Sequence, residues 1–320
     1  MSKEKIIFDS DIGGDCDDAG ALALLHALCE QGEAELLAAT YCFMNPHAAG
    51  CLDAINTYYG KRVPVGVNTV GQVVLFDHYP PESGYRGYSE PIFHTFPHAY
   101  RDQDAPDTLT VLRETLAASG DGEVTIVVTG TLSSMARLVL SEGDKISPLS
   151  GKELISRKVK RTVVMGGRFF EGWPMYVIHG KDPVVRECNI IQDIAAAQTV
   201  CREWTGELIF ASFELGNDCI TLQDFAKNAD YNPAALAYRL YPPAGLRGRE
   251  SWDLIAMLYA VRPQGEAFKL HPWGKISVSD DGVTSFQVDE AGRHSFLLPR
   301  SELSLVRDEI NAIVRGSSRY

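Results

Sequence analysis

Short apolar runs and longer apolar runs with helical spacing alternate over the first two-thirds of the chain. The short runs are rich in valine, isoleucine and leucine, which is typical of strands. We expect strands at 5–8, 34–43, 63–67, 124–130, 161–167 and 206–213, and helices at 19–29, 48–60 and 107–118. Because several of these strands are apolar on both faces, we predict a mostly parallel sheet that helices cover on both sides.

The C-terminal part of the chain has a different pattern. Residues 276–298 contain Asp-Gly and Ala-Gly turns between short runs, which predicts two or three antiparallel strands, and 301–314 has the spacing of an amphipathic helix. We expect 263–320 to be a small β-rich extension of one domain that spans 1–320; whether it closes the sheet edge or meets another subunit stays open. The fold class is therefore α/β, with an open, mostly parallel, Rossmann-like sheet flanked by helices.

Acidic residues are concentrated directly after the first predicted strand. Asp9, Asp11, Asp15, Asp17 and Asp18 lie within ten positions. Open parallel sheets bind ligands at the carboxyl ends of their strands, so these acids lie where a site is expected. Carboxylates this close repel one another, and a hard divalent cation such as Ca²⁺, which takes about 6–8 oxygen ligands, removes the repulsion. Helix capping accounts for one or two acids but not for five, so we predict a metal site.

Composition narrows the possible function classes. The net charge of −12, without a strong basic cluster, argues against nucleic-acid binding through phosphate contacts. Seven cysteines are scattered without a C-x-x-C pair, which indicates reduced thiols. The chain begins without the pattern of a signal peptide and contains no apolar run long enough to span a membrane. We therefore expect a soluble, cytoplasmic protein.

The acidic segment also has the spacing of a known family. The sequence 9–19, DSDIGGDCDDA, resembles the D-x-D-x-G and D-D-A pattern of the inosine–uridine-preferring nucleoside hydrolases. Further segments that resemble this family follow in order at 40–45, 124–138, 163–167, 186–193 and 251–261. The resemblance covers residues 5–262, and it implies calcium-dependent hydrolysis of the N-glycosidic bond of ribonucleosides by a homodimer or homotetramer.

The resemblance implies a role for each matching residue. Asp11, Asp18, Asp253 and the carbonyl of Thr129 would hold Ca²⁺, Asp17 would be the general base, and Asp9 would support the ligands from behind. Asp15 has no counterpart in the family pattern, and it would either support a ligand from behind or act as a substitute base. Asn45, Met165, Glu187 and Asn189 would contact the sugar. Trp252 stands where many members have a histidine that donates a proton to the leaving base. Its indole would stack on the base instead, which favours purine nucleosides.

The chain departs from the family pattern at two further places. Gly14 and Asp15 look like an insertion, because relatives have one residue between the glycine and the paired aspartates. The segment 168–186 is longer than in relatives and lacks the asparagine that contacts the 5′-hydroxyl, so a riboside altered at C5′ stays possible. A proton donor could come from two long loops, from these residues: His78, Tyr79, Tyr85, Tyr88, His94, His98, Tyr100 and His179.

Two other functions, phosphate hydrolysis and riboside binding without catalysis, fit part of the sequence pattern. A haloacid-dehalogenase-like phosphohydrolase also has D-x-D after its first strand, but it has no use for Asp17, Asp18 and the Trp252-Asp253 pair. A non-catalytic riboside binder on the same scaffold would need no general base. Taken singly, Asn189 is compatible with a turn residue, Asp253 with a helix cap, and Met165 and Trp252 with core packing.

Overall fold

The computed structural model describes residues 3–71, 85–101, 104–170 and 186–320, and its centre is a ten-stranded sheet. The strand order is β11 (Thr284–Val288), β10 (Gly274–Val278), β12 (His294–Pro299), β6 (Leu208–Ala211), β5 (Val159–Met165), β4 (Val124–Val128), β1 (Glu4–Ser10), β2 (Ala34–Tyr41) and β3 (Val65–Val67), with β9 (Phe268–Leu270) paired to β12. All neighbours from β12 to β3 are parallel. The predicted α/β class with a mostly parallel sheet is therefore confirmed.

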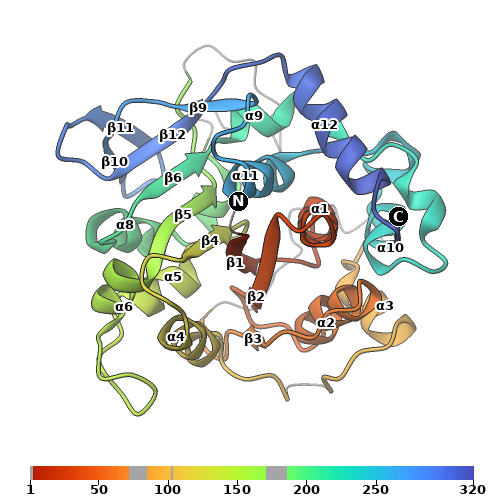
Figure 1. The fold of residues 1–320 in the computed structure, drawn as a ribbon, viewed down its shortest axis with the longest axis horizontal. Coiled ribbons are helices and arrows are strands. Elements are labelled where there is room, and N and C mark those ends of the chain that lie inside the picture. The colour runs from red at the N-terminus through yellow and green to blue at the C-terminus, as the bar shows by residue number, and fades with distance from the viewer. Residues whose placement is uncertain (1–2, 72–84, 102–103, 171–185) are drawn as a thin grey trace.

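Helices cover both faces of this sheet (Figure 1). They are α1 (Asp17–Glu30), α2 (Ala48–Tyr58), α3 (Ser89–Thr95), α4 (Thr108–Ala118), α5 (Ser133–Val139), α6 (Gly151–Lys158), α7 (Cys188–Gln192), α8 (Ile194–Glu203), α9 (Phe213–Asn217), α10 (Pro233–Leu240), α11 (Trp252–Val261) and α12 (Leu303–Arg315). The short elements are β7 (Ile220–Thr221), β8 (Arg249–Glu250) and the 3₁₀ turns η2 (Phe225–Asn228) and η3 (Gly245–Arg247). The sequence pattern located α1, α2, α4 and α12 but not α3, α5, α6 or α10, which are short.

Successive side chains of the central strands pack alternately into two separate hydrophobic cores, one on each face of the sheet. Ile6 and Phe8 of β1 pack on the side of α1, α2, α10, α11 and α12, and Ile7 packs on the side of α4, α5, α6 and α8. Residues of one strand that are two apart point to the same face, so a strand buried on both sides must be apolar throughout. Helix α1 is buried on nearly all of its surface, which explains its uniformly apolar sequence.

The C-terminal strands extend the central sheet. β10 and β11 form the antiparallel hairpin that the turns predicted, but β12 pairs in parallel with β6. Phe296 belongs to one core and Leu297 to the other, so β12 is buried on both faces like the other central strands. β12 also pairs antiparallel with β10 and with β9, so the predicted antiparallel strands are confirmed, and the parallel contact with β6 joins them to the central sheet.

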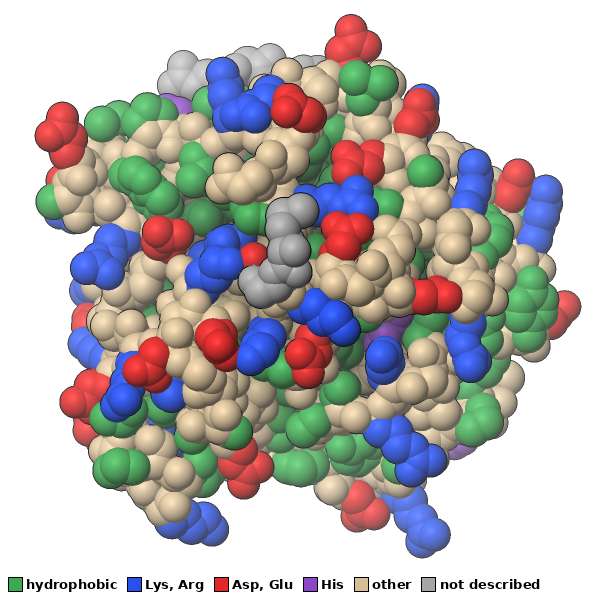
Figure 2. All heavy atoms as spheres, viewed as in Figure 1, with side chains coloured by type: hydrophobic (Ala, Val, Ile, Leu, Met, Phe, Trp, Pro, Cys, Tyr) green, Lys and Arg blue, Asp and Glu red, His purple; other side chains and the backbone are tan. Residues whose placement is uncertain are grey.

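The distribution of surface charge and the length of the helices relate to two possible partners, nucleic acid and membrane. Figure 2 shows Lys and Arg side chains interspersed with Asp and Glu over the visible face. Within the described part of the chain, no helix combines the length and the hydrophobicity that crossing a bilayer requires.

Candidate functional site

Three aspartates from the two ends of the chain converge at the N-termini of two helices. Asp17 and Asp18 lie in the first turn of α1, and Asp253 lies in the first turn of α11, which packs against α1. Oxygens of the three carboxylates lie within 4.8 Å of one another, and all three residues are buried. The backbone N–H of Asp253 donates to Asp17 Oδ2 at 3.3 Å. The helix dipoles favour this placement of negative charge, although Ser251, not Asp253, is the cap residue of α11.

The carboxyl end of β4 closes the site from a second direction. Thr129 Oγ1 donates to Asp18 Oδ1 at 2.7 Å, and the Thr129 N–H donates to the Asp9 carbonyl at 2.8 Å. A Cβ atom on Gly130 would lie 2.8 Å from the backbone nitrogen of Asp11. Only glycine therefore lets the end of β4 approach the acidic loop this closely.

Burial makes ionisation of this cluster costly. It raises the pKa values of Asp17, Asp18 and Asp253 well above the usual range, and the neighbouring carboxylates raise them further. Burial also raises the pKa of Asp11 to about 6, although the Asp18 side chain acts to lower it. Burial raises the pKa of Asp9 to about 7, against the hydrogen bond that Thr40 Oγ1 donates to its Oδ1 at 2.6 Å.

This charge distribution fits a bound cation. Among the described residues, no lysine or arginine forms an ion pair with Asp17, Asp18 or Asp253. Three buried carboxylates that repel one another and lack such a partner form a site that can hold a metal ion. A hard divalent ion is the group whose charge and preference for oxygen ligands match these donors.

A second set of predicted residues lies at the carboxyl ends of β4 and β5. The Asn189 side-chain amide donates to the Thr129 carbonyl at 2.8 Å and lies 3.3 Å from the Met165 carbonyl. Glu187 caps α7, and its carboxylate accepts from the backbone N–H groups of Asn189 at 2.8 Å and Gly167 at 3.2 Å. Burial raises the Glu187 pKa to about 7, although these N–H groups oppose the rise. The structure therefore brings Thr129, Met165, Glu187 and Asn189 together.

Asn45 follows β2 and lies beside the acidic loop. Its side-chain oxygen accepts from the His47 N–H at 2.9 Å, and its amide donates to Ser89 Oγ at 3.2 Å. A Cβ atom on Gly13 would lie 3.0 Å from Ser89 Oγ and 3.8 Å from Asn45 Nδ2. Asn45 is therefore held in part by Ser89, which lies beside Gly13 of the acidic loop.

Asp15 has a partner that the sequence did not indicate. Arg249 Nε donates to Asp15 Oδ1 at 2.8 Å, Arg249 Nη2 donates to Oδ2, and the Tyr241 hydroxyl donates to Oδ2 at 3.0 Å. Burial acts to raise the pKa of Asp15, but the charge and hydrogen bonds of Arg249 outweigh it and hold the pKa below the usual value. Arg249 and Tyr241 were missed because nothing in the local sequence connects them with residue 15.

The Trp252 side chain packs against Phe213 and Arg249. Its indole N–H donates to the Phe213 carbonyl at 2.9 Å, and its ring is stacked on Phe213 with centroids 5.4 Å apart. The Arg249 guanidinium lies over the Trp252 ring, 4.6 Å from the centroid. The indole N–H is therefore already engaged, and two groups lie against the ring.

The candidate proton donors of the long loops are spread over several places. His78, Tyr79 and His179 lie outside the described residues. The Tyr85 hydroxyl donates to the Gly14 carbonyl at 2.6 Å, and the Tyr88 N–H donates to the Gly13 carbonyl at 2.9 Å. The other described candidates lie away from this loop: the Tyr100 hydroxyl accepts from the Val65 N–H, and His98 Nε2 lies 2.8 Å from the Phe93 carbonyl. His94 is exposed on α3. Tyr85 and Tyr88 therefore contact the acidic loop.

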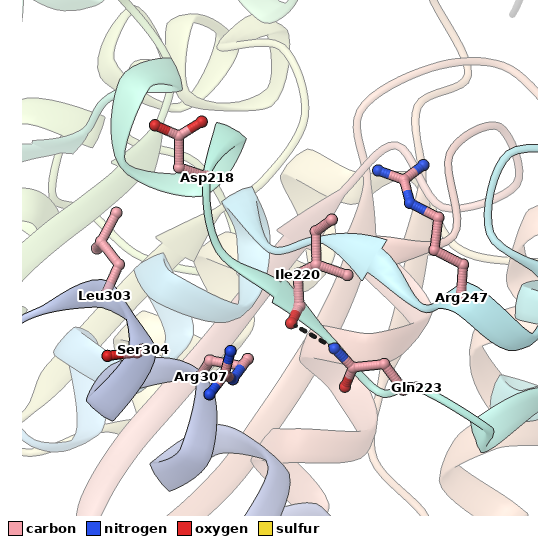
Figure 3. A pocket seen from close by; sticks show the side chains of 7 residues that line it. All are labelled: Asp218, Ile220, Gln223, Arg247, Leu303, Ser304 and Arg307. Carbon is pink, nitrogen blue, oxygen red and sulfur yellow. Dashed lines mark hydrogen bonds between the residues drawn. The ribbon is translucent and has the colours of Figure 1, made fainter.

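A surface cavity of about 380 Å³ lies elsewhere in the molecule (Figure 3). It lies between β7 and the start of α12, with Arg247 and Arg307 among its lining residues. None of the predicted site residues lines it. It is therefore separate from the acidic cluster.

Solved structures of similar fold share this architecture over nearly the whole chain. The inosine-uridine preferring nucleoside hydrolase from Bacillus anthracis is 19% identical, with 98% of this chain and 99% of that chain covered and a TM-score of 0.70. The purine-preferring ribonucleoside hydrolase from Gardnerella vaginalis is 18% identical, with 98% of each chain covered and a TM-score of 0.70. The type III effector protein XopQ, solved with adenosine diphosphate ribose, is 14% identical, with 98% and 92% covered and a TM-score of 0.63.

Comparison at the level of sequence gives the family. No curated protein sequence matches the chain. The family model for inosine-uridine preferring nucleoside hydrolase matches residues 6–295, which include every site residue considered above. The chain therefore belongs to the inosine-uridine preferring nucleoside hydrolase family, whose enzymes hydrolyse N-glycosyl bonds.

Proposed function

We propose that this protein is a calcium-dependent hydrolase of the N-glycosidic bond of purine ribonucleosides, with free base and ribose as products. The observation that carries the proposal is the convergence of Asp17 and Asp18 with Asp253, more than 230 positions away in the sequence, in one buried cluster. Neither a phosphohydrolase with a nucleophilic first aspartate nor a riboside binder has a use for all three.

The proposed metal ligands are Asp11, Asp18, Asp253 and the carbonyl of Thr129. The family is metal-dependent, and a ligand set made only of oxygen atoms favours Ca²⁺ over metals that prefer nitrogen or sulfur. A bound divalent cation would fix the 2′- and 3′-hydroxyls of the ribose and lower the pKa of a water molecule. The Thr129 carbonyl already accepts from Asn189, but a carbonyl oxygen has two lone pairs and can serve both partners.

Asp17 is the general base in this proposal. Burial and the charge of Asp15 raise its pKa, which makes its carboxylate a stronger proton acceptor than one on the surface. The N–H of Asp253 donates to Oδ2, which fixes the orientation of the carboxylate. Asp17 would take the proton of the attacking water as the new C–O bond forms at the anomeric carbon.

The sugar is held in this proposal by Asn45, Met165, Glu187 and Asn189. Three backbone N–H groups fix the Glu187 carboxylate, so its charge has a set position from which it can favour positive charge on the ribose. Asp9 supports the site from behind, because its side chain is tied to Thr40 of the neighbouring strand.

The base would leave on the side of Trp252. The engaged indole N–H makes Trp252 a contact surface rather than a proton donor. The Arg249 guanidinium lies over the Trp252 ring and places a permanent positive charge next to it. A purine offers a larger surface than a pyrimidine for contact with these groups, which is the basis of the proposed preference.

The test compares Asp17→Asn with wild-type protein in an assay of free-base release from purine, pyrimidine and 5′-modified ribosides, with and without a chelator. We expect Asp17→Asn to lower kcat by at least about 10²-fold while the protein still binds Ca²⁺ and nucleoside. Asp53→Asn is the matched control, because Asp53 is also buried but accepts from the Ala99 N–H away from the cluster. Its turnover should not change.

Each other outcome has a distinct meaning. Full turnover of Asp17→Asn would refute the assigned base. Tight riboside binding without release of base in wild-type protein would favour a binding function, and release of phosphate from an aryl phosphate would favour a phosphohydrolase. The assembly as a homodimer or homotetramer and the cytoplasmic location stay predictions, and light scattering of the purified protein tests the first.

A further inference from the structure

We propose that His47, Glu90 and His94 form a second metal site, which takes a transition-metal ion of the Zn²⁺ type. Each of the three residues offers a ligand atom, and these atoms lie within 4.8 Å of one another. His47 precedes α2, while Glu90 and His94 lie on α3. None of the three belongs to the acidic cluster, so this inference does not depend on the proposed nucleoside chemistry.

The packing of α3 on α2 sets the positions of the three ligands. A Cβ atom on Gly50 would lie 2.2 Å from Cδ2 of Phe93, so the glycine lets the Phe93 ring lie directly against α2. The same ring lies 5.1 Å from the His47 ring, centroid to centroid. The two helices therefore hold His47 and the neighbouring His94 in a fixed relation.

The distances suit closure on one ion. Glu90 and His94 are four positions apart on α3, and Glu90 Oε1 lies 4.0 Å from His94 Nε2. The ring of His47 lies 5.5 Å from that of His94. Tetrahedral Zn²⁺ holds its ligands at about 2.0–2.2 Å, which places the donor atoms about 3.4 Å from one another. The donor atoms here lie within 4.8 Å of one another, so small rotations of the two exposed side chains would bring them to that separation.

The donor set separates this site from the acidic cluster. Two imidazole nitrogens and one carboxylate oxygen suit Zn²⁺, whereas a set of oxygen donors suits Ca²⁺. Glu90 and His94 are exposed and His47 is half-buried, so an ion can enter from solvent. Three protein ligands leave one position of a tetrahedral ion open to water or another ligand. Nearby His98 does not belong to the group of ligand atoms that lie within 4.8 Å of one another, and its Nε2 is hydrogen-bonded to the Phe93 carbonyl.

An ion here would connect the two segments that hold Asn45. The His47 N–H donates to the Asn45 side-chain oxygen at 2.9 Å, and Asn45 donates to Ser89, the residue before Glu90. Joining His47 to Glu90 and His94 through a metal would therefore restrict both hydrogen-bond partners of Asn45. The expected consequence is a stiffer attachment of α3 to α2.

The experiment uses the full chain without an affinity tag, stripped of metal, saturated with Ca²⁺ and then titrated with Co²⁺ or Zn²⁺. We expect one equivalent of Co²⁺ to bind with the visible absorption of a tetrahedral ion, and Zn²⁺ to displace it. His94→Ala and Glu90→Gln, both at exposed positions, should lower the affinity more than about tenfold, the effect of losing even an outer partner of a metal site.

Two controls identify the site. Asp18→Asn, in the acidic cluster, should keep the Co²⁺ signal, which separates this site from the proposed calcium site. His98→Gln removes a neighbouring histidine and should also keep the signal. Unchanged Co²⁺ affinity in His94→Ala, or no Co²⁺ binding by the Ca²⁺-saturated wild-type protein, would overturn the proposal, and neither result would bear on nucleoside hydrolysis.

Discussion

Asp15 and Arg249 form an ion pair that joins the acidic loop to the strand before Asp253. They are 234 positions apart, and Arg249 Nε lies 2.8 Å from Asp15 Oδ1 and 3.1 Å from Oδ2. Arg249 also contacts Glu250 and lies over the rings of Trp252 and Tyr241. Asp15, one of the two residues that look like an insertion, thus anchors β8 and the start of α11 to the acidic loop.

Breaking this ion pair should destabilise the protein. Asp15→Asn should lower the free energy of unfolding by about 2 kcal/mol, less than the roughly 3–5 kcal/mol for a fully buried pair, because the pair is only partly buried and Glu250 still contacts Arg249. Asp121→Asn is the control, since Asp121 pairs with Arg157 at an exposed position and its loss should have a much smaller effect on the free energy of unfolding. Urea unfolding of both variants measures the difference. Equal effects would show that Asp15 contributes no more than a surface charge.

Gly130 should be required for the arrangement of the metal ligands. Gly130→Ala places a methyl group 2.8 Å from the Asp11 nitrogen and 2.6 Å from Cys42 Sγ, so the acidic loop must move. We expect Ca²⁺ affinity to fall at least about tenfold, as measured by calorimetry. Gly206→Ala is the control, because its new methyl group meets neighbours at 3.5 Å, an ordinary contact distance. Unchanged Ca²⁺ binding in Gly130→Ala would contradict the assignment of Asp11 as a ligand.

Stabilisation by Ca²⁺ should increase with pH. The pKa values of Asp9 and Glu187 are raised to about 7 and that of Asp11 to about 6 by burial, so the metal-free folded state binds protons that the unfolded state releases. The contribution of these groups to the unfolding free energy therefore falls as pH rises from about 4 to about 7, and levels off above.

Bound Ca²⁺ requires ionised carboxylates and removes this penalty. The difference in Tm with and without Ca²⁺ should be larger at pH 8 than at pH 5, as scanning calorimetry can measure. Asp11→Asn should reduce the dependence on pH. A difference in Tm that does not change with pH would show that the cation binds elsewhere.

Trp252 should affect purine substrates more than pyrimidine substrates. Trp252→Ala removes the aromatic surface and should lower kcat/KM for inosine about tenfold more than for uridine, given a loss of about 1–3 kcal/mol per base stacked. Trp252→Phe keeps an aromatic ring but removes the hydrogen bond to the Phe213 carbonyl, so it separates stacking from positioning. Equal losses for the two nucleosides would assign Trp252 to packing alone.

Local sequence determined the strands of the parallel sheet, the longer helices α1, α2, α4 and α12, and the place of the N-terminal acids. Strands apolar on both faces predicted the parallel sheet, and β1 predicted the place of Asp11, Asp17 and Asp18, because a strand and the loop after it are contiguous in the chain. Asp253 and Asn189 were assigned to the site because segments that resemble the family follow one another in the family's order. The structure places Asp253 beside Asp17 and Asp18, and it places the Asn189 amide against the Thr129 carbonyl.

Tertiary structure alone decided the rest. The pairing of β12 with β6, the partner of Asp15, the contacts of Trp252 and the approach of His47 to His94 all join segments far apart in sequence. Hydrophobic pattern specifies which face of an element is buried, but not which distant element covers it. Those choices depend on the packing of whole helices and strands around the two cores, and a single sequence does not show that packing.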